Sequence, residues 1–235
     1  MSGAMGAVGV TTPLELWGGV ECTINRVGDR YRDQLALAGH YTRAEADVDR
    51  IAALGVRAVR WPILWERHHG PNASAAWAHT DRMLARWRQH GVRVIAGLLH
   101  HGSGPPHTAL TDPTLPEQLA AFAHDVVTRY PWIDAWTPVN EPLTTARFAG
   151  LYGLWYPHAR HDRAFVVALV QQVHATQRAM QAIRAVQPEA QLVATEDLGY
   201  SHANAALRYQ AAFENERRWL TWDLLLGHVQ RGHPL

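Results

Sequence analysis

The feature that most constrains the fold is a repeated alternation of short apolar runs with segments of helical period. Strands are predicted at residues 14–20, 56–61, 92–99, 133–139 and 191–195, and helices at 42–54, 80–90, 114–130, 162–186 and 204–229. Strands that alternate with helices form a parallel sheet with right-handed crossovers, so an α/β fold is expected. Residues 1–12 are small, uncharged and rich in glycine, which predicts a flexible tail before a single domain at 13–235.

The spacing of the predicted strands limits how many units the chain holds. Strand ends near Trp61, Leu99, Val139 and Thr195 imply one strand–helix unit in roughly 40 to 56 residues. A closed (βα)8 barrel at that spacing needs more than about 300 residues, so 235 residues fit an incomplete (βα)8 TIM barrel of about five units, or a five-stranded doubly wound sheet. A sheet with open edges leaves two outer strands unpaired, and such edges are usually covered. We expect the N-terminal tail or a second chain in a homo-oligomer to cover them.

Composition excludes several kinds of chemistry and partner. All 22 basic residues are arginines, and without lysine the chain has no Schiff-base residue, pyridoxal-phosphate lysine or Walker-type phosphate loop. The single cysteine, Cys22, excludes an internal disulfide, a cysteine zinc site and an iron–sulfur cluster. A net charge of +1 gives no electrostatic case for nucleic acid. Since no leader pattern and no membrane-spanning apolar run is seen, we expect a cytoplasmic protein without membrane contact.

Polar residues follow every predicted strand at the edge where α/β folds gather their functional side chains. The residues at these strand ends are Glu21, Arg60, Trp65, His100, His101, Asn140, Glu141, Glu196 and Asp197. Each one alone has a structural explanation; Glu21, for example, could cap a helix or pair with Arg60. Their coincidence at successive strand ends favours one shared functional rim.

The segment from Trp136 to Pro142, Trp-Thr-Pro-Val-Asn-Glu-Pro, resembles the acid/base motif of the clan A glycoside hydrolases, in particular the family 1 β-glucosidase type. The segment 49–65 resembles that family's strand-two segment, and Leu99-His100 resembles its strand-three histidine. The likeness runs in the right order from about residue 14 to the end of the sequence. More narrowly, the segment 17–26 resembles the family-1-like domain that some bacteria fuse to a dTDP-4-dehydrorhamnose reductase.

The resemblance implies a glycosidase that acts on β-glycosidic bonds without a cofactor or a metal. It implies that Glu141 is the general acid/base, that Asn140 binds the sugar 2-hydroxyl, and that Arg60 and His100 line the sugar site. Such cleavage needs a proton on the departing oxygen and a negative charge near the forming oxocarbenium ion. Tryptophans such as Trp155 offer flat apolar faces to a pyranose, although most of the ten tryptophans are expected in the core.

The sequence also departs from the family pattern. The family's Glu-Asn-Gly nucleophile motif from strand seven and its strand-six tyrosine do not occur before Leu235, and the strand-one glutamine is replaced, with Glu21 as a candidate substitute. The second carboxylate is therefore expected from Glu196, Asp197, Glu21 or another chain. We favour Glu196 as a second catalytic residue, because adjacent parallel strands lie about 4.8 Å apart and retaining enzymes hold their carboxyl groups about 5–5.5 Å apart.

Two other functions fit the same residues less well. A metal-dependent TIM-barrel hydrolase could use the histidines at 68–69, 100–101 and 107, but these lack metal-binding spacing, and adjacent side chains on a strand point apart. A catalytically impaired, carbohydrate-binding barrel fragment that needs another chain is the third hypothesis. It is motivated by the last residues, 217–235, which resemble mid-domain sequence.

Overall fold

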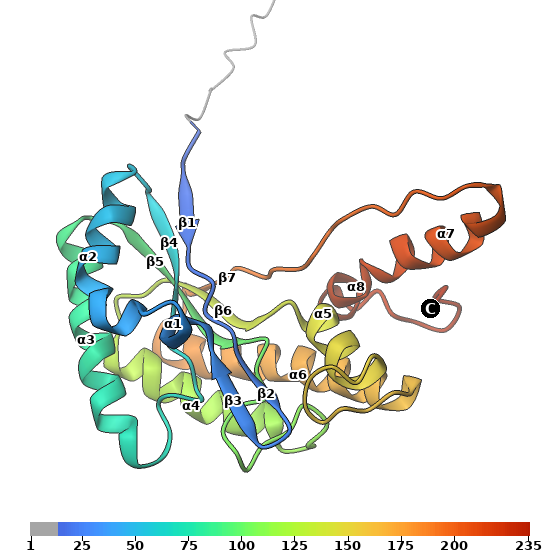
Figure 1. The fold of residues 1–235 in the computed structure, drawn as a ribbon, viewed down its shortest axis with the longest axis horizontal. Coiled ribbons are helices and arrows are strands. Elements are labelled where there is room, and N and C mark those ends of the chain that lie inside the picture. Colours follow the sequence, from blue (N-terminus) through green and yellow to red (C-terminus); the bar gives the residue numbers. More distant parts are fainter. Residues whose placement is uncertain (1–13) are drawn as a thin grey trace, which may run out of the picture.

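A computed structural model describes residues 14–235 and contains a five-stranded parallel sheet. Its strands are β1 (Trp17–Gly19), β4 (Ala58–Pro62), β5 (Arg93–His100), β6 (Ala135–Asn140) and β7 (Gln191–Leu192), and they lie side by side in that order (Figure 1). The five predicted parallel strands are thus confirmed. The tail predicted at residues 1–12 lies outside the described residues.

The order of the strands distinguishes the two predicted architectures. A doubly wound sheet reverses its strand order at a switch point, whereas here each new strand adds to the same side of the one before it. The crossover helices α2 (His40–Ala53), α3 (Ala73–Gln89), α4 (Leu115–Arg129) and α6 (Asp162–Val186) form a layer against the sheet (Figure 1). The fold is therefore a partial TIM barrel, and within residues 14–235 the outer edges of β1 and β7 have no strand partner.

Successive side chains along each strand point to opposite faces of the sheet, and the two faces differ in how many apolar residues they bury. Val59, Val94 and Trp136 belong to the large core beneath the helices. Their sequence neighbours Ala58, Ile95 and Ala135 form a separate small cluster, because successive strand side chains point to opposite faces. The helix-facing layer carries most of the apolar burial, so the other face has room for polar groups at its carboxyl end.

A β-hairpin after β1 was not predicted. Its strands β2 (Ile24–Val27) and β3 (Arg30–Asp33) are antiparallel and are joined by a two-residue turn with Gly28 at φ +59°. Glycine adopts this left-handed conformation without a steric penalty, so the Gly-Asp pair at 28–29 was the readable signal. The short helix α1 (Gln34–Leu37) follows directly, and Asp33 caps it by accepting from the Ala36 amide at 3.0 Å.

Two helix starts differ from the predicted capping boxes. Helix α2 begins at His40, earlier than expected, and the Thr42 hydroxyl donates to the Gly39 carbonyl at 2.8 Å instead of capping the helix. Helix α4 begins where predicted, but the Thr114 hydroxyl donates to Asp112 at 2.7 Å and caps no amide. The Ser/Thr-x-x-Glu pattern thus placed helix starts approximately without specifying the capping bonds.

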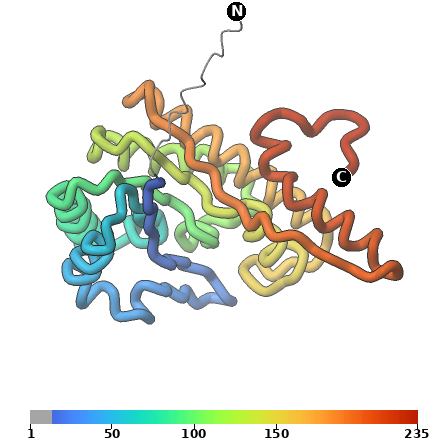
Figure 2. The backbone as a smooth tube through the Cα atoms, turned by 90° about the horizontal axis from the view of Figure 1, so that it is seen from above, coloured from blue at the N-terminus to red at the C-terminus, as the bar shows by residue number. Residues whose placement is uncertain are grey.

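The chain after β6 is more broken than predicted. Helix α5 (Pro142–Ala146) and the π-helix η2 (Arg147–Leu151) follow β6, and the single helix expected at 204–229 is divided into η3 (Ala205–Leu207), α7 (Arg208–Arg217) and α8 (Leu220–Leu226). The segment after β7 runs out to α7, and the chain then returns so that α8 packs against α5 and α6 (Figures 1 and 2). Across residues 14–235, every helix is too short or too polar to cross a membrane.

Candidate active site

The carboxyl ends of the strands bring the predicted polar residues to one rim. The register pairs His100 of β5 directly with Asn140 of β6, and Arg60 lies near the end of β4. Glu141 follows β6, and the chain after β7 leads to Thr195 and Glu196. The rim therefore forms because parallel strands in register end at the same edge of the sheet.

Asn140 is the centre of a hydrogen-bond network and is 2% exposed. Its Oδ1 accepts from Arg60 Nη1, and also from the Thr195 hydroxyl at 3.0 Å. Its Nδ2 lies 3.0 Å from Nε2 of His101 and 3.4 Å from Nε2 of His100. Both polar atoms of the amide are thus engaged, which fixes the orientation of the Asn140 side chain.

The same network fixes the protonation of the two histidines. Asn140 Nδ2 is a donor, so Nε2 of His101 accepts and its proton lies on Nδ1, 2.9 Å from the Thr145 hydroxyl. Burial lowers the pKa of both histidines, and that of His100 falls to about 3. Both rings are therefore neutral at pH 7 and are no ion-pair partners for nearby carboxylates.

Glu141 has an unusual backbone conformation. It lies in the left-handed region at φ 45° and ψ 66°, and His101, which follows the paired strand β5, has φ 53°. For a residue other than glycine this conformation costs about 1–3 kcal/mol, and such strain concentrates at functional sites. The Glu141 side chain is 26% exposed, and its Oε2 lies 3.8 Å from His101 Nε2. The backbone thus places the carboxyl group at the rim, where it is accessible from solvent.

Glu196 lies behind the segment that carries Glu141. Its Oε1 accepts from the Leu143 amide at 2.6 Å and from the Thr221 hydroxyl at 2.7 Å. Its Oε2 is buried without a hydrogen-bond partner. Burial raises the pKa of Glu196, and the charge of Glu141 raises it further. Glu196 thus joins the end of β7 to the first turn of α5 and to α8.

Glu21 and Trp155 lie beside this network. Glu21 is exposed, its Oε1 is 3.9 Å from His100 Nε2, and hydrogen bonds from Thr23 outweigh partial burial and lower its pKa. The half-buried Trp155 ring packs against His101, with centroids 5.4 Å apart. The structure therefore brings all seven predicted site residues to the rim or its border, while their roles stay predictions.

Comparison with known proteins identifies the family. The family model described as glycosyl hydrolase family 1 matches residues 19–227. This chain belongs to glycosyl hydrolase family 1. A β-glucosidase from Agrobacterium sp. is 29% identical to this chain over 140 residues. The match covers 55% of this chain and 30% of that protein. The chain thus spans less than half the length of the curated relative that it matches.

Solved structures of other proteins show the same fold. A β-glucosidase from Thermotoga maritima in complex with castanospermine has a TM-score of 0.71 at 21% identity, covering 83% of this chain and 46% of that one. The AHE enzyme from Alicyclobacillus herbarius has a TM-score of 0.67 at 23% identity, covering 76% of this chain and 43% of that one. At this level of identity the likeness establishes the partial barrel fold.

Several residues of the hydrogen-bond network around Asn140 were not predicted as such from the sequence. Thr195 was predicted only as a strand residue and Thr145 not at all, while His101 was predicted at the rim and considered for the metal hypothesis, without its contact to Asn140. The adjacency of Thr195 to Glu196 and of His101 to His100 was the available signal. Among the described residues, no group of three or more His, Cys, Asp or Glu side chains is placed to hold a metal ion.

Proposed function

We propose that this family 1 chain hydrolyses β-glycosidic bonds and that Glu141 gives the proton to the departing oxygen. The observation that carries the proposal is the strained, accessible Glu141 that directly follows the Asn140 network at the end of β6. A carboxyl group that a defined backbone conformation places at the rim can meet a glycosidic oxygen there. The β-glucosidase relatives support the same substrate class.

The sugar would lie over Asn140, Arg60 and His100, beside the Trp155 ring. Because both amide atoms of Asn140 already have protein partners, a sugar hydroxyl must replace one of these contacts. The 3.4 Å contact to His100 is the longest of them and the easiest to exchange. Neutral His100, with exposed Glu21 beside it, can then donate to or accept from the same sugar.

Glu196 is proposed as the second carboxylate of a retaining reaction. Its proximity to Glu141 is supported by the bond to Leu143, two residues beyond Glu141, and by the effect of the Glu141 charge on its pKa. Its bonds to Leu143 and Thr221 also brace α5 against α8. A nucleophilic role would use the unpartnered Oε2, so the catalytic and bracing roles need separate tests.

A carbohydrate-binding fragment that works with another chain is the second candidate. The open edges of β1 and β7 favour it, since both border one groove of about 810 Å³ lined by Trp17, Leu192 and Trp222 among others. Exposed Trp17 at this groove supports the proposal that a second copy of the chain covers the edges in a homo-oligomer.

Two finer points also stay proposals. The relationship to the domain fused to a dTDP-4-dehydrorhamnose reductase rests on the segment 17–26. A cytoplasmic location stays a prediction.

The test is the release of 4-nitrophenol from 4-nitrophenyl β-glucoside and β-galactoside. Glu141→Gln removes the proton and keeps the shape of the side chain, so turnover should fall by about a hundredfold or more. Glu117→Gln, the same change on the exposed face of α4, is the matched control and should keep the wild-type rate. Equal turnover by wild type and Glu141→Gln would reject the proposed role. Binding of these glycosides without any turnover would favour the carbohydrate-binding fragment.

A further inference from the structure

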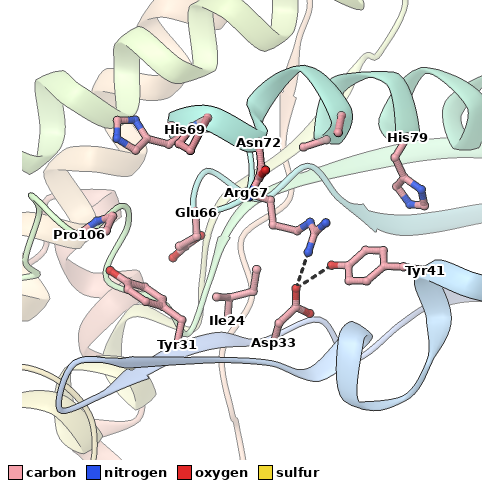
Figure 3. A pocket seen from close by; sticks show the side chains of 14 residues that line it. Ile24, Tyr31, Asp33, Tyr41, Glu66, Arg67, His69, Asn72, His79 and Pro106 are labelled. Atoms are coloured by element: carbon pink, nitrogen blue, oxygen red, sulfur yellow. Dashed lines mark hydrogen bonds and ion pairs between the residues drawn. The ribbon is translucent and has the colours of Figure 1, made fainter.

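A pocket of about 700 Å³ lies between the β2–β3 hairpin and the start of α3, apart from the Asn140 network. The hairpin contributes Ile24, Tyr31 and Asp33, and Tyr41 comes from α2. The opposite wall is the segment after β4, the η1 turn (Gly70–Asn72) and the first turns of α3 (Figure 3). Its volume lies within the range of about 300–1,000 Å³ that is typical of small-molecule sites.

Glu66 lines this pocket and has an unsatisfied oxygen. Its Oε1 accepts from the Gly104 amide at 3.1 Å, but its Oε2 is buried and has no hydrogen-bond partner. Figure 3 shows Glu66 extending from its wall into the space above Tyr31 and Ile24. The Glu66 side chain lines the pocket, and a buried carboxylate is costly, so a positively charged donor in the pocket would stabilise its ionised form.

The other charges of the pocket cancel. Asp33 accepts from Arg67 Nη1 at 2.8 Å and from the Tyr41 hydroxyl at 2.9 Å (Figure 3). The Tyr31 hydroxyl donates to the Gly104 carbonyl at 3.1 Å. These donors are thus used within the protein, and the ion pair is internally neutral. An ionised Glu66 therefore gives the pocket one uncompensated negative charge.

We propose that this pocket binds a small organic ammonium ion, whose charged head donates to Glu66 and whose apolar body lies against Ile24, Tyr31 and Pro106. An ammonium group brings donors and a positive charge and needs no acceptor satisfied in return. A hydroxyl in the same place supplies a donor, but it leaves the negative charge uncompensated. The aromatic face of Tyr31 adds a favourable surface for a cation.

The proposal predicts a dependence on pH that comes from Glu66. Burial raises the pKa of Glu66 to about 7, with a smaller contribution from the charge of Asp33. Ammonium binding requires the carboxylate, so affinity should rise as pH increases from below to above this value. The titratable and charged groups around Glu66 and the pocket are Cys22, Tyr31, Asp33, Tyr41, Arg67, His69 and His79. Of these, His79 stays neutral above its pKa of about 4, to which burial lowers it. Arg26 lies beside Pro106 and Tyr31 and is paired with Asp29 at 3.3 Å.

The experiment compares benzylammonium chloride with benzyl alcohol by calorimetry and by NMR titration of the full chain. Wild type should bind benzylammonium saturably at pH 8, at least about tenfold more tightly than benzyl alcohol and about tenfold more tightly than at pH 6. Glu66→Gln should lose at least about tenfold in affinity for benzylammonium and lose its pH dependence. The matched control Glu117→Gln should bind as wild type does.

A second variant guards against an effect of Glu66→Gln on folding. Ala75→Trp places a large side chain at the exposed edge of the pocket and keeps Glu66, and it should abolish binding. The proposal is overturned if wild type shows no saturable binding of benzylammonium at pH 8. It is equally overturned if benzyl alcohol binds as tightly, or if folded Glu66→Gln binds benzylammonium as wild type does.

Discussion

Replacing Glu66 by glutamine should make the stability of the protein less dependent on pH. Burial raises the pKa of this carboxyl from 4.5 to about 7 in the folded chain, while the unfolded chain keeps the ordinary value. Between these two values the folded state binds more protons than the unfolded state. The free energy of unfolding of the wild type therefore decreases as pH rises through this range, and the glutamine variant lacks this contribution.

The size of the effect follows from the two pKa values. One pKa unit corresponds to about 1.4 kcal/mol, so ionised Glu66 destabilises the folded state by about 3 kcal/mol above pH 7. About 2.5 kcal/mol of this develops between pH 5 and pH 8, because the unfolded chain is already largely ionised at pH 5. The glutamine amide also leaves a buried donor unpaired, which costs about 1–3 kcal/mol at every pH and cancels in the comparison between pH values.

The assay is urea unfolding of wild type, Glu66→Gln and the exposed control Glu117→Gln at pH 5, 6, 7 and 8. The difference in unfolding free energy between wild type and Glu66→Gln should shift by about 2.5 kcal/mol in favour of the variant from pH 5 to pH 8. Glu117→Gln should stay within about 0.5 kcal/mol of wild type throughout. A difference between wild type and Glu66→Gln that does not change with pH would refute the reasoning.

Three further variants test other contacts. Gly102→Ala should destabilise the fold by about 1–3 kcal/mol in urea unfolding, because its Cβ would lie 1.9 Å from Glu66 Oε1. An unchanged unfolding midpoint would show that the Glu66 side chain moves aside without cost. Thr145→Val removes the partner of His101 Nδ1 at nearly constant volume, so kcat for an aryl β-glucoside should fall about tenfold with folding intact, and a wild-type kcat would argue against the need for this bond. Glu196→Gln keeps an acceptor for the α5 amide, so a folded variant with turnover reduced by at least about a hundredfold supports a second catalytic carboxylate, whereas normal turnover leaves it a structural brace.

The fold was predictable from sequence wherever the pattern of apolar residues matches the pattern of buried residues. The strand at 92–99 was clear because nearly every residue of β5 is buried. The last strand was predicted at 191–195 but pairs with β6 only at Gln191–Leu192. The hairpin was missed because Asn25 and Arg32 make its strands too polar for an apolar pattern.

The site was predictable in its residues but not in its connections. The rule that function gathers at strand ends placed Arg60, His100 and Asn140 on one rim, and parallel register explains why. The left-handed backbone of Glu141 could not be predicted, because no glycine marks the position. The hydrogen bond that His101 Nδ1 donates to the Thr145 hydroxyl depends on side-chain orientation across a turn of α5, which no sequence spacing encodes.

The dependence of rate on the leaving group tests the role of Glu141 most directly. A strongly acidic leaving group such as 2,4-dinitrophenol departs without protonation, whereas methanol needs a proton from the enzyme. Glu141→Gln should therefore lose at least about a hundredfold in bond cleavage with methyl β-glucoside and far less with 2,4-dinitrophenyl β-glucoside. An equal loss on both substrates, or no loss on either, would contradict the assignment of Glu141 as the proton donor.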